Sequence, residues 1–122
     1  MTQQGLHLDA ETAADVATDL WRARRRLARA GGDRMLTRHL DGLHDRLARA
    51  GLEVQEHEGL VVDAGTALDV VAWEIRPDVE RDVVVETVAP SVYCAGRQIR
   101  IGQVVVARPE DRGDGGGGAP DG

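Results

Sequence analysis

The spacing of apolar residues predicts two helices in the first half of the chain. The first is expected over residues 9–30, with Asp9 as its N-cap and Gly31-Gly32 as its stop. The second is expected over residues 33–50, with Asp33 as its N-cap. In both ranges the apolar residues recur at intervals of three and four, which gathers them on one side of a helix. The stripes are Val16, Leu20, Ala23 and Leu27 in the first range, and Leu36, Leu40, Leu43, Leu47 and Ala50 in the second.

A short turn joins these ranges, so we expect an antiparallel helical hairpin. In a single copy of this hairpin the apolar residues of both ranges would stay exposed to water. Each leucine left exposed loses about 1.5–3 kcal/mol of burial free energy. We therefore predict that two copies pair through the stripe and form a four-helix bundle. The predicted dimerisation residues are Val16, Leu20, Leu27, Leu36, Leu40, Leu43 and Leu47.

From Leu52 onward the pattern changes to short apolar runs separated by turn residues, which is typical of β-strands. The chain is therefore predicted to be α+β, with the dimeric helical hairpin followed by a small, mainly antiparallel β-domain. The predicted strands are Leu60–Val62, Leu68–Ile75, Val83–Val88, Val92-Tyr93 and Ile99–Val106. The predicted ranges are a disordered start over 1–8, the hairpin over 9–51, the β-domain over 52–108 and a disordered Gly/Asp-rich tail over 109–122.

Composition narrows the class of protein. The 122 residues have a formal net charge of −6, which argues against general nucleic-acid binding because that needs a basic face. The chain contains no run of about 18 apolar residues, so no membrane span is predicted. The N-terminus has no visible signal peptide, and the chain contains one cysteine, Cys94. We expect a cytoplasmic protein with no nucleic-acid or membrane partner.

The residues suited to catalysis or metal binding do not form a recognised pattern. The four histidines lack metal-ligand spacing, and Cys94 has no recognisable catalytic partner. We expect no catalytic residue, no metal and no cofactor, and hence a protein that is not an enzyme. The arginine-rich run over residues 22–29 is interpreted as a solvated helix face, with contact to an acidic partner or to nucleic acid as the alternative.

The most distinctive motif begins at Tyr93. A short polar turn with Gly96-Arg97 follows the aromatic residue, and Ile99-Arg100 then leads into a valine-rich run that ends near Ala107. This order resembles the closing segment of the β-domain of GrpE, the nucleotide exchange factor of DnaK-type chaperones. Further segments that resemble the family in the same order are Asp19–Ala23, Gly51–Val54, Val62–Ala64, Leu68–Val71 and Val83–Val88.

The chain also departs from the family pattern. Ala64 stands where the family has proline, Leu68-Asp69 where it has a His-Glu pair, and Val92 where it has glycine. Only about eight residues precede the first predicted helix, whereas the family has a long N-terminal stalk helix. The resemblance therefore covers the hairpin and the β-rich half, and functions of the stalk are expected to be absent or much reduced.

The resemblance implies a homodimeric co-chaperone. Such a protein binds the nucleotide-binding domain of a DnaK-type chaperone and promotes ADP release by stabilising its open form. An alternative is a dimeric adaptor that keeps the fold but has lost exchange activity, because the loop over residues 64–69 is altered. The partner-binding residues implied by the resemblance are Val62, Asp63, Ala64, Ala89, Arg97 and Val106.

Overall fold

The computed structural model describes residues 5–110, which fold into two compact units. The first unit contains the chain up to Gln55 together with Ser91–Arg100, and the second contains Glu56–Pro90 together with the chain from Ile101. The predicted disorder of residues 1–4 and 111–122 lies outside the described residues. Each unit has its own cluster of buried apolar side chains.

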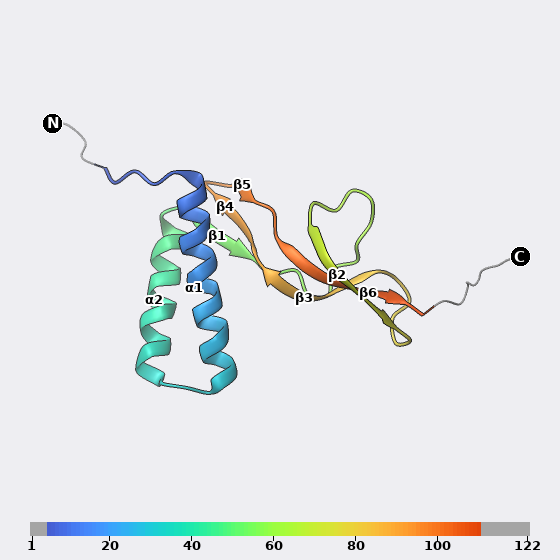
Figure 1. The fold of residues 1–122 in the computed structure, drawn as a ribbon. Helices are drawn as coiled ribbons and strands as arrows, with labels where there is room; N and C mark the ends of the chain where they lie inside the picture. The colour runs from blue at the N-terminus through green and yellow to red at the C-terminus, as the bar shows by residue number, and fades with distance from the viewer. Residues whose placement is uncertain (1–4, 111–122) are drawn as a thin grey trace, which may run out of the picture. The chain divides into compact units, whose positions relative to one another are not determined.

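Two helices, α1 (Ala10–Ala30) and α2 (Arg34–Arg49), run antiparallel in the first unit (Figure 1). The predicted N-caps are confirmed. Asp9 Oδ1 accepts a hydrogen bond from the Thr12 amide at 2.7 Å, which lowers the pKa of the Asp9 carboxyl from its ordinary value. Gly31 ends α1 with a φ of 64°, a left-handed conformation that glycine adopts readily. Among the described residues, neither helix is long and apolar enough to cross a membrane.

One side of α1 packs against a three-stranded antiparallel sheet in the same unit. The strands are β1 (Leu52–Gln55), β4 (Ser91–Cys94) and β5 (Arg97–Arg100), in the order β1-β4-β5. The small side chains of Ala14 and Ala17 pack around Val92 of the central strand. This buried side of α1 also contains Trp21, so it differs from the predicted stripe, in which Val16 stays exposed.

The second unit contains β2 (Asp69–Arg76), β3 (Val83–Ala89) and β6 (Gln103–Pro109). β6 lies in the middle, parallel to β2 and antiparallel to β3 (Figure 1). The sheet is therefore mixed, whereas a mainly antiparallel one was expected. Its core consists of Val84, Val104 and Val106, and Val62, Leu68 and Val70 pack against them.

The α+β class is confirmed, but two strand predictions need correction. The run Ile99–Val106 is not one strand, because Ile101-Gly102 separates β5 from β6 and each part joins a different sheet. Leu60–Val62 forms only an isolated bridge between Val61 and Val83. The predicted division at residue 52 also differs from the observed grouping, because β1, β4 and β5 pack with the helices.

The cap of α2 provides a local test of the fold. Asp33 Oδ1 accepts hydrogen bonds from the amides of Met35 at 2.8 Å and Leu36 at 3.2 Å. We expect Asp33→Ala to lower the free energy of unfolding by about 1 kcal/mol in urea titrations, because these amides lose their acceptor. Asp33→Ser keeps an acceptor and should lose much less. Equal stability of Asp33→Ala and the unaltered protein would contradict this role of Asp33.

Candidate functional site

The motif around Arg97 forms a tight hairpin between β4 and β5. Cys94 pairs with Arg97, and the two residues between them, Ala95 and Gly96, have φ values of 52° and 82°. Two successive positive φ values suit the twist of a two-residue hairpin loop. A left-handed alanine is uncommon, and here the Ala95 amide donates a hydrogen bond to the Gly51 carbonyl at 2.8 Å. The turn that presents Arg97 is therefore held to the residue just before β1.

Successive residues of β5 have different roles. Ile99 packs against the core of the first unit. Arg100 Nη1 donates to Asp15 Oδ1 at 2.8 Å, and Arg100 Nη2 donates to the Glu11 carbonyl at 3.4 Å, so this arginine fastens β5 to α1. Arg97 is exposed at the start of the strand. Of the two arginines in the motif, Arg97 is thus the one available to a partner.

The predicted contact loop over Val62–Ala64 lies in the second unit. Asp63 Oδ1 accepts hydrogen bonds from the Gly65 amide at 2.9 Å and from Thr66 Oγ1 at 3.1 Å. The Asp63 amide donates to Thr66 Oγ1 at 3.0 Å. These bonds close the loop on itself, with Asp63 and Ala64 exposed and Val62 half-buried.

The six predicted partner-binding residues are not equivalent in the structure. Arg97 belongs to the first unit, and the other five belong to the second. Val106 is wholly buried and Ala89 is buried, so their side chains belong to the interior of the protein. The exposed candidates are Asp63, Ala64 and Arg97, with Val62 partly accessible beside the first two.

The seven predicted dimerisation residues are here called the leucine stripe, and three of them, Val16, Leu36 and Leu43, are exposed. No residue of α2 is buried, and Leu36 and Leu43 keep exposed fractions of 46% and 47%. Leu20, Leu27, Leu40 and Leu47 are half-buried. The two helices are also joined by a hydrogen-bonded ion pair in which Arg24 Nε lies 3.0 Å from Asp41 Oδ1.

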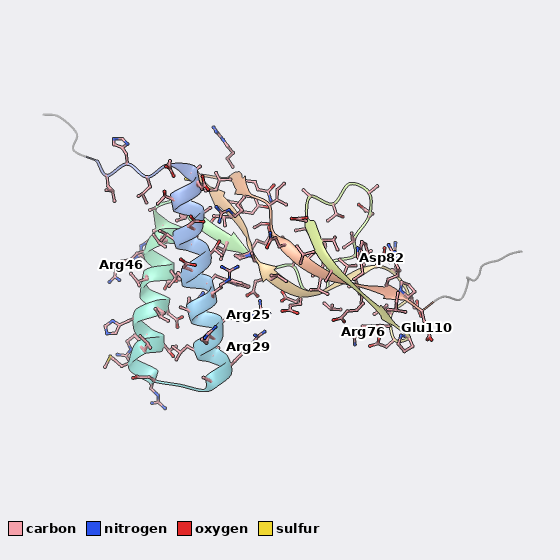
Figure 2. The ribbon with its side chains drawn as sticks, in the orientation of Figure 1. Arg25, Arg29, Arg46, Arg76, Asp82 and Glu110 are labelled. Carbon is pink, nitrogen blue, oxygen red and sulfur yellow. The ribbon has the colours of Figure 1, made fainter. Side chains whose placement is uncertain are left out.

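Charged side chains occupy other sides of the two helices. Figure 2 shows Arg25 and Arg29 on α1, and Arg46 extending from α2 on the side away from α1. The Arg25 guanidinium lies 4.8 Å from the centre of the Trp21 ring, within the range of a cation–π contact. Within residues 5–110, no group of three or more His, Cys, Asp or Glu side chains is arranged to hold a metal ion.

Sequence reasoning missed a polar cluster in the second unit, in which Thr87 is buried, His57 is half-buried and Glu58 is exposed. Thr87 is almost wholly buried, and its hydroxyl donates to Glu58 Oε1 at 2.8 Å while its amide donates to Glu58 Oε2 at 2.9 Å. The His57 amide in turn donates to Thr87 Oγ1 at 3.0 Å. Partial burial lowers the pKa of the His57 imidazole, and the nearby Glu58 charge opposes that shift. The cluster ties the segment before the contact loop to β3.

The chain matches no protein-family model and no curated protein. Any functional proposal therefore depends on the sequence motif and on the geometry described above.

The Glu58–Thr87 cluster can be tested by removing one hydroxyl. In Thr87→Val, the His57 amide loses its acceptor and one Glu58 oxygen loses a donor. The Glu58 carboxylate is exposed and can bind water instead, whereas the half-buried His57 amide is left without its acceptor. The free energy of unfolding should therefore fall by about 1 kcal/mol in urea titrations. Thr87→Ser keeps the hydroxyl and should lose less, although serine is less apolar than valine. A valine variant at least as stable as the serine variant would contradict the role of the cluster.

Proposed function

We propose that this chain is a short, homodimeric, GrpE-like nucleotide exchange factor for a DnaK-type chaperone. The observation that carries the proposal is the Gly-Arg-x-Ile-Arg segment over residues 96–100. Ile99 and Arg100 attach this segment to the helical unit, and Arg97 stays exposed at the turn. A segment in which two residues hold the strand in place and a third is exposed to a partner suits a docking element.

The chemistry of Arg97 supports a docking role. A guanidinium presents its N–H groups in a planar fork that can bind a carboxylate or a carbonyl with defined direction. Because the hairpin is fixed by the Ala95–Gly51 hydrogen bond, little backbone ordering remains to be done on binding. On this proposal Arg97 and the exposed contact loop, Val62–Ala64, meet the nucleotide-binding domain. Ala89 and Val106 are left out because their side chains are buried.

Exchange activity of this kind needs no catalytic group. The factor binds the open form of the nucleotide-binding domain better than the closed, ADP-loaded form, and that difference in affinity limits how far it can shift the equilibrium. By reciprocity, bound ADP weakens binding of the factor by the same ratio. A thousandfold acceleration of ADP release would correspond to about 4 kcal/mol of preference for the open form.

The leucine stripe supports the dimeric part of the proposal. A second hairpin laid on Leu36, Leu43 and their neighbours would bury apolar surface that the single chain leaves in water. The charged sides of both helices would stay outside such a bundle. The proposed dimer is therefore a four-helix bundle in which each chain contributes α1 and α2.

The self-contained contact loop favours a second candidate, the dimeric adaptor without exchange activity. Asp63 uses its Oδ1 oxygen to hold Gly65 and Thr66, and the loop lacks the proline and the His-Glu pair of the family. An adaptor would bind its partner with the same affinity in the presence and absence of ADP. This indifference to ADP separates it from an exchange factor.

The dimer can be tested by adding charge to the leucine stripe. Leu36→Glu combined with Leu43→Glu should convert the protein to a monomer in sedimentation equilibrium, because burying uncompensated carboxylates in a bundle is costly. Met35→Glu is the matched control, since Met35 is also exposed on α2 but lies outside the stripe. A monomeric unaltered protein, or a dimer that survives the double substitution, would contradict the proposed bundle.

The exchange function can be tested by the release of a fluorescent ADP analogue from the DnaK-type chaperones of the source organism. The unaltered protein should accelerate release, and Arg97→Ala should reduce its affinity for the chaperone about tenfold or more. A hydrogen bond to a charged group contributes about 1.5–3 kcal/mol, and 1.4 kcal/mol corresponds to tenfold. Arg38→Ala, which removes an exposed arginine from α2, is the control.

The same assay separates the candidates. Acceleration that weakens in Arg97→Ala would support the exchange factor. Tight binding that ADP does not change, without acceleration, would support the adaptor instead. If the protein neither binds any of these chaperones nor accelerates release, both functions are excluded.

A further inference from the structure

Strand β2 is an edge strand with an unusually apolar surface. Within the described residues it pairs only with β6, so the N–H and C=O groups on its other side lack strand partners. β2 is eight residues long and contains Val71, Trp73 and Ile75, all of which are exposed. Long, apolar edge strands attract further strands, and proteins usually block them with charge, proline or a covering segment.

The β2–β6 register shows where two of these side chains lie. Trp73 pairs with Val106 and Ile75 pairs with Arg108, and the register shifts once, between Val70 and Ala72. Residues paired across neighbouring strands share a face of the sheet, so Trp73 and Ile75 lie on the same face as the buried Val106. Val71 lies at the register shift.

This face is covered at one end only. Val62, Leu68 and Val70 pack against the core valines. Beyond them, Trp73 keeps an exposed fraction of 47% and Ile75 one of 63%. The apolar face of the sheet thus continues past the segment that covers it and ends next to an open strand edge.

The charges beside this surface are already paired within the unit. The Arg108 guanidinium lies 4.1 Å from the centre of the Trp73 ring, and its Nη2 lies 3.4 Å from Asp82 Oδ2. Arg76 donates hydrogen bonds to both carboxylate oxygens of Asp78, at 3.0 and 2.8 Å. Figure 2 shows Arg76 and Asp82 at this end of the sheet. Because both arginines already have carboxylate partners, the binding partner that suits this surface is apolar and uncharged, not acidic.

We propose that the open edge of β2, with Trp73 and Ile75, binds an extended, apolar segment of another protein as an added strand. The backbone groups of the edge would supply directional hydrogen bonds, and Trp73 and Ile75 would contact alternate apolar side chains of the segment. Tryptophan and arginine are each enriched among the residues that dominate the binding energy of protein interfaces.

Two occupants from the chain itself fit less well. Residues 111–122 contain no large apolar side chain that could cover Trp73 and Ile75. A second copy paired through β2 would add a twofold interface to the proposed helical dimer. Two different twofold interfaces would build an assembly larger than the proposed dimer, either a closed tetramer or an open chain. Only the exclusion of a second copy depends on the proposed dimer.

The test uses the full chain and a capped, fluorescein-labelled peptide of alternating threonine and valine. We expect peptide anisotropy to rise on binding, and the outward amides of β2 to gain protection from hydrogen exchange. The same peptide with a central proline should not bind, because proline disrupts strand pairing. This control leaves the protein unchanged, so misfolding cannot explain its result.

Matched variants locate the contact. Ile75→Glu should weaken peptide binding at least tenfold, whereas Ile101→Glu should bind normally, since Ile101 has an exposed fraction of 52% in the same unit but lies outside the sheet. Absence of peptide binding, or equal binding by Ile75→Glu, would overturn the proposal. Concentration-dependent assembly abolished by Ile75→Glu would also overturn it, in favour of a second copy. Release of ADP is measured separately, so the exchange function can fail or stand independently.

Discussion

A hairpin of two helices cannot enclose its own leucines, and this constraint shapes the first unit. The sheet of β1, β4 and β5 covers the side of α1 that contains Ala14, Ala17 and Trp21, where small side chains allow close approach. It leaves no residue of α2 buried. Leu36 and Leu43 therefore each forgo on the order of 1 kcal/mol of burial in a single copy. Because the net stability of a small domain is only about 5–15 kcal/mol, this loss is a physical reason for the unit to have a partner.

The chain passes between the two units at Gln55, Pro90 and Arg100. The last passage, at Ile101-Gly102, ends one strand and starts another in a different sheet. The Gly102 carbonyl accepts a hydrogen bond from the Asp69 amide at 2.9 Å, which fixes the start of β2 beside β6. Both units therefore depend on segments that are distant in sequence, and neither can form from one continuous stretch of chain.

Local signals explain which parts of the structure were predictable from the sequence. Asp9, Asp33 and Gly31 act on neighbouring amides and carbonyls, so the helix ends follow from the residues themselves. The break at Ile101 has only a weak local signal, Gly102, and long-range pairing is what assigns the two halves of Ile99–Val106 to different sheets. The burial of Val106 likewise results from long-range strand pairing. The contact between Glu58 and Thr87 joins residues 29 apart, and no spacing rule relates them.

The exposure of Arg97 could be predicted from the sequence more easily than the contacts that hold its turn and strand in place. A turn residue beside glycine is expected to be exposed, whereas the contacts of Arg100 with Asp15 and Glu11 span more than 80 residues of sequence. Under the proposed exchange function, which depends on binding alone, this support matters. Free energy used to order a loose hairpin on docking would weaken binding to the open and the closed form of the partner alike, so it would lower the affinity without changing the preference. A turn held by Gly51 and a strand held by α1 reduce that loss. Under the proposed function the anchoring residues would therefore raise the affinity for the chaperone without touching it.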